Sequence, residues 1–213
     1  MKHPILLAIS ASLLAGTALA GSTEAPVFPV TQIAPPAATT DWSGFYAGGM
    51  VSFSGETAYL YYALGIFADS GGLAANTAFG AFAGYNFQHG AFVYGGEVAV
   101  DSGGIGTAGT DLKYGPMVDV KARAGYAFGR ALAYGVVGRS FATFHDPNSP
   151  QMNYSYPGGG FVYGAGLDYK INDQLFVGVE YLVRDLAGGS DSDDTFEIKS
   201  NIQSVQLRIG WQF

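Results

Sequence analysis

Apolar and polar residues alternate with a period of two along most of this chain, and that pattern constrains its fold more than any other feature. Between residues 92 and 101, one face is aromatic and aliphatic, whereas the other carries the carboxylates of Glu97 and Asp101. Because successive side chains of a strand point to opposite faces, the pattern predicts strands with one apolar and one polar face. The same alternation recurs in residues 118–128, 161–171, 175–184 and 204–213.

Three further segments, residues 43–53, 77–87 and 132–143, have strand composition, but both of their faces mix Gly, Ala and aromatic residues. Eight strands result, each near the ~9–11 residues with which a tilted strand crosses a bilayer. The longest apolar run, residues 58–68, has 11 residues, whereas a membrane-spanning helix needs about 20. The sequence therefore predicts an all-β fold, an eight-stranded antiparallel transmembrane up-and-down β-barrel.

The connections between the predicted strands alternate in length, as expected of an outer-membrane barrel with short periplasmic turns and long outer loops. The long connections are rich in Gly, Asp, Ser and Asn, which suits surface loops. The short turns are residues 88–90, 129–130 and 172–174, and the long loops are residues 54–76, 102–115, 144–158 and 186–200.

The composition excludes several classes of function. With 10 basic and 17 acidic residues and no run of Lys or Arg, the chain has no electrostatic basis for binding nucleic acid. It has no cysteine, which excludes disulfides, thiolate metal sites and cysteine nucleophiles. Charged residues make up 13% of the chain, against ~25% in soluble domains. No motif for a cofactor is found, so none is expected.

The N-terminal residues have the features of an export signal. Lys2 precedes an apolar stretch, and Ala18-Leu19-Ala20 supplies a small-residue cleavage pattern, so residues 1–20 are predicted to be a signal peptide cut after Ala20. Residues 21–41 contain four prolines among Ala and Thr, a composition that opposes both helix and central strand. We interpret this second segment as a periplasmic tether and residues 42–213 as the barrel.

Two observations favour an apolar face turned outward to lipid over a soluble lipocalin-type barrel with that face inside. Aromatic residues gather near the ends of the apolar face, where membrane barrels carry interfacial girdles. The polar face has five acids and six bases, which can neutralise one another in a narrow lumen. The predicted girdle is Phe92, Tyr126, Phe128, Tyr169, Tyr181, Trp211 and Phe213. The predicted lumen charge network is Glu97, Asp101, Asp119, Lys121, Arg123, Arg139, Asp168, Lys170, Glu180, Arg184 and Arg208.

The lumen charges have two interpretations. The interior of an eight-stranded barrel is about wide enough for its own side chains, so a lumen filled by paired charges is expected. The alternative is a narrow diffusion pore in which the same charges line a path for small solutes or ions.

Several segments, taken in order, resemble one known family. Residues 41–49 resemble the opening strand of the alphaproteobacterial outer-membrane immunogenic proteins, a "porin family" of small OmpA-like barrels. The terminal Trp211-Gln212-Phe213 is similar to the strand signal, ending in Phe213, that the barrel-assembly machinery reads. The resemblance covers residues 41–213 and implies an integral outer-membrane protein exposed at the cell surface of a Gram-negative bacterium, with no settled activity. Later strands of the family are similar to residues 83–87, 93–97, 122–127 and 178–181.

Three local features carry weaker hypotheses. The three aspartates in residues 191–194 either bind a divalent cation or form a solvated acidic loop, and they lack the Gly and distal Glu of a calcium loop. The apolar segment 58–68 either docks a partner or packs on neighbouring loops. Ser140, His145 and Asp146 form a local Ser/His/Asp group whose spacing makes no nucleophile–base pair, so no catalytic residue and no metal site are expected.

We therefore expect a structural and surface-interaction role in the cell envelope. The expected partners are outer-membrane lipid and lipopolysaccharide, the barrel-assembly machinery, and an extracellular partner reached through the loops.

The lipid-facing orientation predicts how the purified chain behaves. Folded protein should stay dispersed only with detergent or lipid, and it should migrate faster on a gel before boiling than after, because a closed barrel resists unfolding by the detergent. Sedimentation and a heat-modifiability gel measure both properties. A mature chain that stays compact and monomeric in plain buffer would contradict the orientation.

Overall fold

The structure is a computed structural model, and it describes residues 40–55, 57–63, 66–73, 75–104, 113–146, 154–189 and 196–213. The predicted signal peptide, nearly all of the predicted tether, and the acidic residues 191–194 lie outside these ranges. Among the described residues, no helix is long and apolar enough to cross a membrane.

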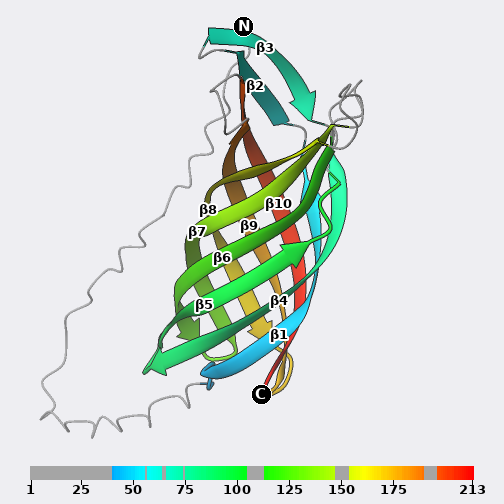
Figure 1. The fold of residues 1–213 in the computed structure, drawn as a ribbon. Coiled ribbons are helices and arrows are strands. Elements are labelled where there is room, and N and C mark those ends of the chain that lie inside the picture. The colour runs from blue at the N-terminus through cyan, green and yellow to red at the C-terminus, as the bar shows by residue number, and fades with distance from the viewer. Residues whose placement is uncertain are drawn as a thin grey trace, which may run out of the picture. The chain divides into compact units, whose positions relative to one another are not determined.

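The described residues form ten strands, eight of which build a closed antiparallel barrel. In Figure 1 the barrel strands run side by side in chain order and tilt around a common axis. The last strand pairs with the first, from Tyr46 opposite Gln212 to Ser54 opposite Ser204, and this pairing closes the sheet. The barrel strands are β1 (Gly44–Ser54), β4 (Asn76–His89), β5 (Phe92–Asp101), β6 (Lys113–Phe128), β7 (Ala131–Asp146), β8 (Tyr154–Lys170), β9 (Leu175–Gly189) and β10 (Phe196–Gln212). This confirms the predicted fold class.

The two remaining strands lie in a segment expected to be a loop. Residues 54–76 contain a hairpin of β2 (Thr57–Ala63) and β3 (Ile66–Leu73), and β2 pairs with β10 from Ser200 opposite Tyr59 to Phe196 opposite Ala63. The hairpin forms because β10 continues past Ser204, where its pairing with β1 ends, and so offers an edge. The apolar segment 58–68 is therefore built largely into a sheet that extends the barrel wall.

Five of the barrel strands are longer than the sequence pattern predicts. β6, β7, β8, β9 and β10 have 15 to 17 residues each, whereas about 9–11 cross a bilayer. The extra residues lie at the end opposite the tight turns, so they shorten the predicted loops 102–115, 144–158 and 186–200. The barrel wall thus continues beyond the thickness of a membrane on one side.

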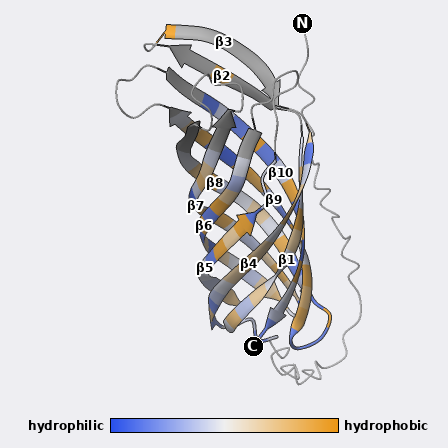
Figure 2. Ribbon diagram, turned by 45° about the vertical axis from the view of Figure 1, so that its right-hand side comes forward, coloured by the Kyte–Doolittle hydropathy of each residue, from blue (hydrophilic) through white to orange (hydrophobic). Residues whose placement is uncertain are grey.

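Buried and exposed side chains alternate along the barrel strands, which places successive side chains in the lumen and on the outer surface. Figure 2 shows hydrophobic and hydrophilic residues interspersed along the barrel wall. The five segments with clear alternation turn their apolar face outward, as predicted. In the three weaker segments, now β1, β4 and β7, the inward face is also apolar. It carries rings such as Tyr46, Phe82 and Tyr134, together with Met50. An apolar face on both sides explains why these strands showed no clear period in sequence.

The short connections are tight turns at the predicted places. Gly90 and Gly129 have φ of 61° each, a conformation that glycine adopts without steric cost. In the third turn, the side chain of Asn172 accepts hydrogen bonds from the backbone N–H groups of Gln174 and Leu175, at 2.9 and 2.7 Å. All three turns lie at the same end of the barrel, which we call the turn-bearing rim.

A bulkier residue at Gly166 should destabilise the barrel, because the Tyr134 ring lies where a side chain would begin. A Cβ added at Gly166 would be 2.4 Å from Cζ and Oη of Tyr134, whereas one added at Gly135 meets nothing closer than 3.8 Å. We expect Gly166→Ala to lower the free energy of unfolding by ~1–3 kcal/mol. The matched control, Gly135→Ala on the adjacent strand, should be neutral or slightly stabilising. Urea unfolding in lipid vesicles measures both, and equal effects would contradict the packing.

Candidate functional site

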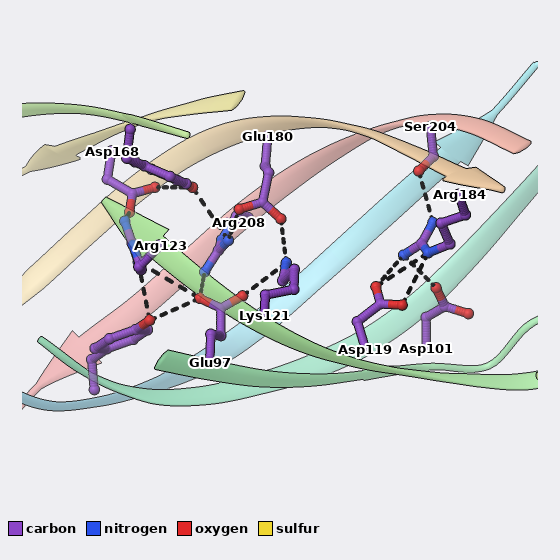
Figure 3. A network of polar contacts seen from close by, with 12 residues as sticks. Glu97, Asp101, Asp119, Lys121, Arg123, Asp168, Glu180, Arg184, Ser204 and Arg208 are labelled. Carbon is purple, nitrogen blue, oxygen red and sulfur yellow. Dashed lines mark hydrogen bonds and ion pairs between the residues drawn. The ribbon is translucent and has the colours of Figure 1, made fainter. Parts of the chain in front are cut away.

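One group of six charged side chains in the lumen comes from five strands, and we name it the central cluster. β5 and β6 supply Glu97 and the pair Lys121 and Arg123, and Figure 3 shows these facing the residues from β8, β9 and β10. All six are buried, with at most 3% of their surface exposed. The cluster consists of Glu97, Lys121, Arg123, Asp168, Glu180 and Arg208.

Four members of the central cluster form a closed ring of ion pairs. Arg208 contacts Glu97 at 2.5 Å and Glu180 at 2.6 Å through its two terminal nitrogens. Lys121 contacts the same two carboxylates, at 3.0 and 2.5 Å. Because each base bridges both acids, the ring ties β5, β6, β9 and β10 together across the lumen.

Arg123 extends the central cluster toward the turn-bearing rim. Its Nη2 donates to Asp168 at 2.8 Å, and its Nη1 donates to the Tyr46 hydroxyl at 3.1 Å. That hydroxyl in turn donates to Glu97 at 3.0 Å. The guanidinium also lies over the Tyr134 ring, 3.8 Å from its centroid, so hydrogen bonds and a cation–π contact fix the side chain.

A second group, the outer cluster, lies farther along the lumen and consists of Arg184, Asp101, Asp119 and Ser204. Arg184 donates to both oxygens of Asp119, from Nε to Oδ1 at 3.2 Å and from Nη2 to Oδ2 at 2.7 Å, a bidentate pair. It also contacts Asp101 at 3.4 Å and the Ser204 hydroxyl at 3.0 Å. One base here serves two acids, as Figure 3 shows.

The charges balance almost completely. The central cluster has three acids and three bases, whereas the outer cluster has two acids and one base. Removing a buried ion from water costs several kcal/mol, and only close opposite charges with further hydrogen bonds offset that cost. The arrangement is therefore held by mutual pairing, and removing one member leaves its buried partners with fewer opposite charges.

The turn-bearing mouth is sealed by a segment preceding β1. Trp42 is 1% exposed and packs edge-on against Phe176, with ring centroids 6.0 Å apart. Its backbone N–H donates to the Gln88 side chain at 2.6 Å, and Lys170 Nζ lies 5.2 Å from the centre of its ring. Gln212 donates to the Ser43 carbonyl at 2.5 Å. We name Trp42, Gln88, Lys170 and Gln212 the inner seal.

Asp41 starts the inner seal with a local turn. Its carboxylate accepts hydrogen bonds from the hydroxyl and the backbone N–H of Ser43, at 2.6 and 2.8 Å, and these lower its pKa below the usual value. Stability from this turn is therefore present at neutral pH and is lost as the pH falls through the lowered pKa. The Asp41 carbonyl also accepts a hydrogen bond from Lys170 at 2.6 Å.

Apolar residues close the lumen on the far side of the outer cluster. Met117, Leu186 and Ile202 each lie two residues beyond a member of that cluster on their own strand, and each is at most 2% exposed. The charged interior is thus enclosed between the inner seal and an apolar layer.

The geometry and the sequence point to the same family. The family model described as "Outer membrane protein beta-barrel domain" matches residues 27–213. This chain belongs to that family. A "22 kDa outer membrane protein" of Rhizobium leguminosarum bv. viciae is 28% identical over 85% of this chain and 83% of its own length. A "25 kDa outer-membrane immunogenic protein" of Brucella abortus is 28% identical over 98% and 97%.

The fold of this outer-membrane barrel has a solved counterpart. OprG, an outer membrane protein from Pseudomonas aeruginosa, superposes with a TM-score of 0.52 at 13% identity, covering 82% of this chain and 99% of that one. This likeness shows the barrel architecture alone. Together with the family membership, it confirms the resemblance and the outer-membrane location expected from the sequence.

Among the predicted lumen residues, Arg139 is placed wrongly. Nine of the predicted charges lie in the two clusters, and Lys170 lies apart from them in the inner seal. Arg139 is exposed on the outer surface, 5.1 Å from the centre of the Phe161 ring. The prediction failed on β7 because both faces of this strand are apolar. The charge of Arg139 was then the only indication that its side chain points into the lumen. Ser140, the next residue, is the one that points inward, and it is fully buried.

The predicted girdle residues all lie on the outer surface of this outer-membrane barrel, with 41% to 77% of each exposed. Around the turn-bearing rim, neighbouring rings touch in sequence, for example Phe92 with Tyr126 at 5.2 Å and Tyr126 with Phe128 at 4.7 Å. Tyr181 is an exception, since it is the seventh of 15 residues in β9 and lies mid-strand. Its hydroxyl donates to the Gln203 side chain at 2.8 Å.

Sequence reasoning missed the aromatic half of the site. Tyr46 and Tyr134 bind the charges, while Trp42 forms the inner seal. The sequence carries no clear signal for the phase of β1, because Gly48 and Gly49 lie on opposite faces of the strand. No signal marks Trp42 either, which precedes the strand.

Neutralising one member of the central cluster should destabilise the barrel strongly. Glu97→Gln leaves Lys121 and Arg208 sharing the single carboxylate of Glu180, so we expect a loss of ~3–5 kcal/mol in the free energy of unfolding. Adding Lys121→Met should recover part of the loss, since the charge count balances again. Urea titration in vesicles measures both against Asp173→Asn in an exposed turn, which should change stability by less than about 0.5 kcal/mol. An effect of Glu97→Gln as small as this control would contradict the network.

Proposed function

We propose that this protein is a structural component of the outer membrane, with a lumen closed by paired charges and an outer rim that presents surface to the exterior. The observation that carries the proposal is the ring of Glu97, Lys121, Glu180 and Arg208, which spans the lumen with contacts of 2.5 to 3.0 Å. Such a ring occupies the width that a solute would need.

The rest of the lumen supports the same role. The Phe176 and Trp42 rings fill the end near the turns, and Met117, Leu186 and Ile202 fill the other end. An eight-stranded barrel encloses about enough space for its own side chains, and this interior is filled at three successive heights. A filled barrel resists unfolding and leaves the membrane sealed.

The narrow diffusion pore remains the second candidate, and one observation favours it. Gln206 is fully buried between the two clusters, and neither its amide oxygen nor its amide nitrogen has a hydrogen-bond partner in the described structure. Ser140 Oγ is in the same situation. Unpaired polar groups in the lumen can bind water or an ion, and a path through the barrel would use them.

The outer rim supports the surface role. The strands β6 to β10 continue beyond the thickness of a bilayer and the β2–β3 hairpin is added to β10, so the wall projects outward from the membrane. Exposed apolar side chains such as Leu60 and Ile66 lie on this hairpin. An extracellular partner bound through this rim, and recognition of Phe213 by the barrel-assembly machinery during insertion, are parts of the proposal.

Single-channel recording in planar bilayers tests the closed lumen. The wild-type protein should give no steady conductance steps, whereas Trp42→Ala combined with Arg123→Ser, which removes the inner seal and one side of the central cluster, should give steps. Heat-modifiability of the same preparation verifies that both proteins are folded and inserted.

The pore hypothesis predicts the opposite record. Steady wild-type steps whose size changes in Glu97→Gln but not in Asp185→Asn, an exposed residue of β9, would overturn the closed lumen. Asp185→Asn removes the same charge from the outside of the wall, so it separates an effect of the lumen from an effect of net charge.

A further inference from the structure

Arg139 occupies an unusual position, because it is a charged side chain on the lipid-facing surface of a membrane barrel. Ten basic residues occur in the chain, and five of them point into the lumen or the inner seal. Arg130 lies in a tight turn, where it donates to a backbone carbonyl. Only Arg139 and Lys199 are exposed on the outer face of the strands, among basic residues whose side chains the structure describes.

The neighbours of Arg139 do not neutralise it. Cross-strand partners are Val120 on β6 and Phe161 on β8, and the guanidinium lies 5.1 Å from the centre of the Phe161 ring. No ion pair of Arg139 occurs within the described part of the chain. In hydrocarbon such a group costs ~2–4 kcal/mol near the midplane but only ~0–1 near an interface. The depth of Arg139 in the membrane therefore decides which groups its guanidinium can bind.

The strand geometry places Arg139 near the outer edge of the apolar band. It lies eight residues beyond Ala131, the first residue of β7 after the turn. At ~3.3 Å per residue and a tilt of ~40°, this separation corresponds to ~20 Å along the membrane normal, against an apolar band ~25 Å tall. The aromatic girdle at Phe92, Tyr126 and Phe128 marks the opposite interface.

The residues level with Arg139 show the same boundary. Along one row of the sheet, Phe161 lies opposite Asp185, and Asp185 lies opposite Asn201 and is hydrogen-bonded to it. Directly below this row the outward side chains of β7 and β8 are apolar, namely Val137 and Tyr163, and β10 carries the uncharged Gln203. Among the described residues above the turns, this row is thus the first level of the outer surface with charged side chains, and we take it as the level where lipid headgroups meet the protein.

The surface just above Arg139 is open. Gly159 and Ala187 face outward side by side on β8 and β9, and they leave a low floor between Phe141 on β7 and Lys199 on β10. This surface combines a guanidinium, an aromatic ring and a floor of small residues at headgroup height. Such a surface fits a bulky anionic headgroup whose acyl chains descend along Val137 and Tyr163.

From this juxtaposition we propose that Arg139 and the adjoining outward faces of β7 to β10 form a binding site for a phosphate group of the phosphorylated glycolipid of the outer leaflet. Arg139 donates to the phosphate oxygens, Phe161 supports the guanidinium, and the apolar rows below contact the acyl chains. The site depends on the outer-membrane location and the strand phase, and it does not depend on whether the lumen is closed.

Thermal unfolding of the full folded chain in detergent micelles tests the site, because a ligand bound only to the folded barrel raises the midpoint. The probes are diphosphorylated lipid A, the same lipid A stripped of phosphate, and inorganic phosphate. Diphosphorylated lipid A should raise the midpoint at the lowest concentration, whereas the stripped lipid should need about tenfold more. Inorganic phosphate should give no shift, since it lacks the acyl chains.

Variants separate the site from general electrostatics. Arg139→Gln should require about tenfold more diphosphorylated lipid A for the same shift, and Arg139→Lys should fall between it and the wild type. Arg130→Gln, which removes an equal charge at the opposite rim, should behave as wild type. A heat-modifiability gel verifies that each variant is folded. Equal response of Arg139→Gln and wild type, equal protection by the stripped lipid, or protection by inorganic phosphate would each overturn the proposal.

Discussion

The structure depends on one constraint, which is that a backbone in hydrocarbon must satisfy every N–H and C=O group by itself. β1 and β10 meet this constraint by pairing along nine consecutive positions, from Tyr46–Gln212 to Ser54–Ser204, so that no open edge remains at membrane height. Closure with eight strands fixes a narrow interior. That narrow interior then brings side chains from opposite walls within contact distance, and the pairing of charges across the lumen follows from it.

The interior combines two kinds of packing that need each other. On one side, rings from β1 and β7 lie against glycines of neighbouring strands, as Tyr134 does at Gly166. On the other side, carboxylates and bases project from β5, β6, β9 and β10. The aromatic packing and the charged groups meet at the tyrosine hydroxyls and ring faces, since Arg123 contacts both Tyr46 and Tyr134. Without the rings, the charges would face a void, and without the charges the hydroxyls would be buried unpaired.

The sequence was sufficient for the architecture and for much of the candidate site, and the reason is the solvent. A strand between lipid and a polar lumen must alternate, and the five segments that alternate clearly placed Glu97, Lys121 and Arg208 inward correctly. Where lipid lies on one side and aromatic rings on the other, as on β7, the period disappears and the phase of Arg139 could not be read. Trp42 was missed because its burial depends on the mouth of the closed barrel, a feature that local pattern does not contain. The hairpin β2–β3 was missed for a similar reason, since it depends on an edge that β10 offers only after closure.

The outward charges carry information that the inward ones do not. Inside, Arg184 and Arg208 are explained by the acids they contact, so their presence requires no further partner. Outside, Arg139 has an aromatic neighbour and no acidic one among the described residues, yet it lies on a surface from which charge is otherwise excluded up to that height. A lipid-facing charge is tolerated only where the medium itself changes from hydrocarbon to headgroup. The position of Arg139 therefore marks the outer boundary of the membrane on this wall, just as the ring contacts of Phe92, Tyr126 and Phe128 mark the inner one.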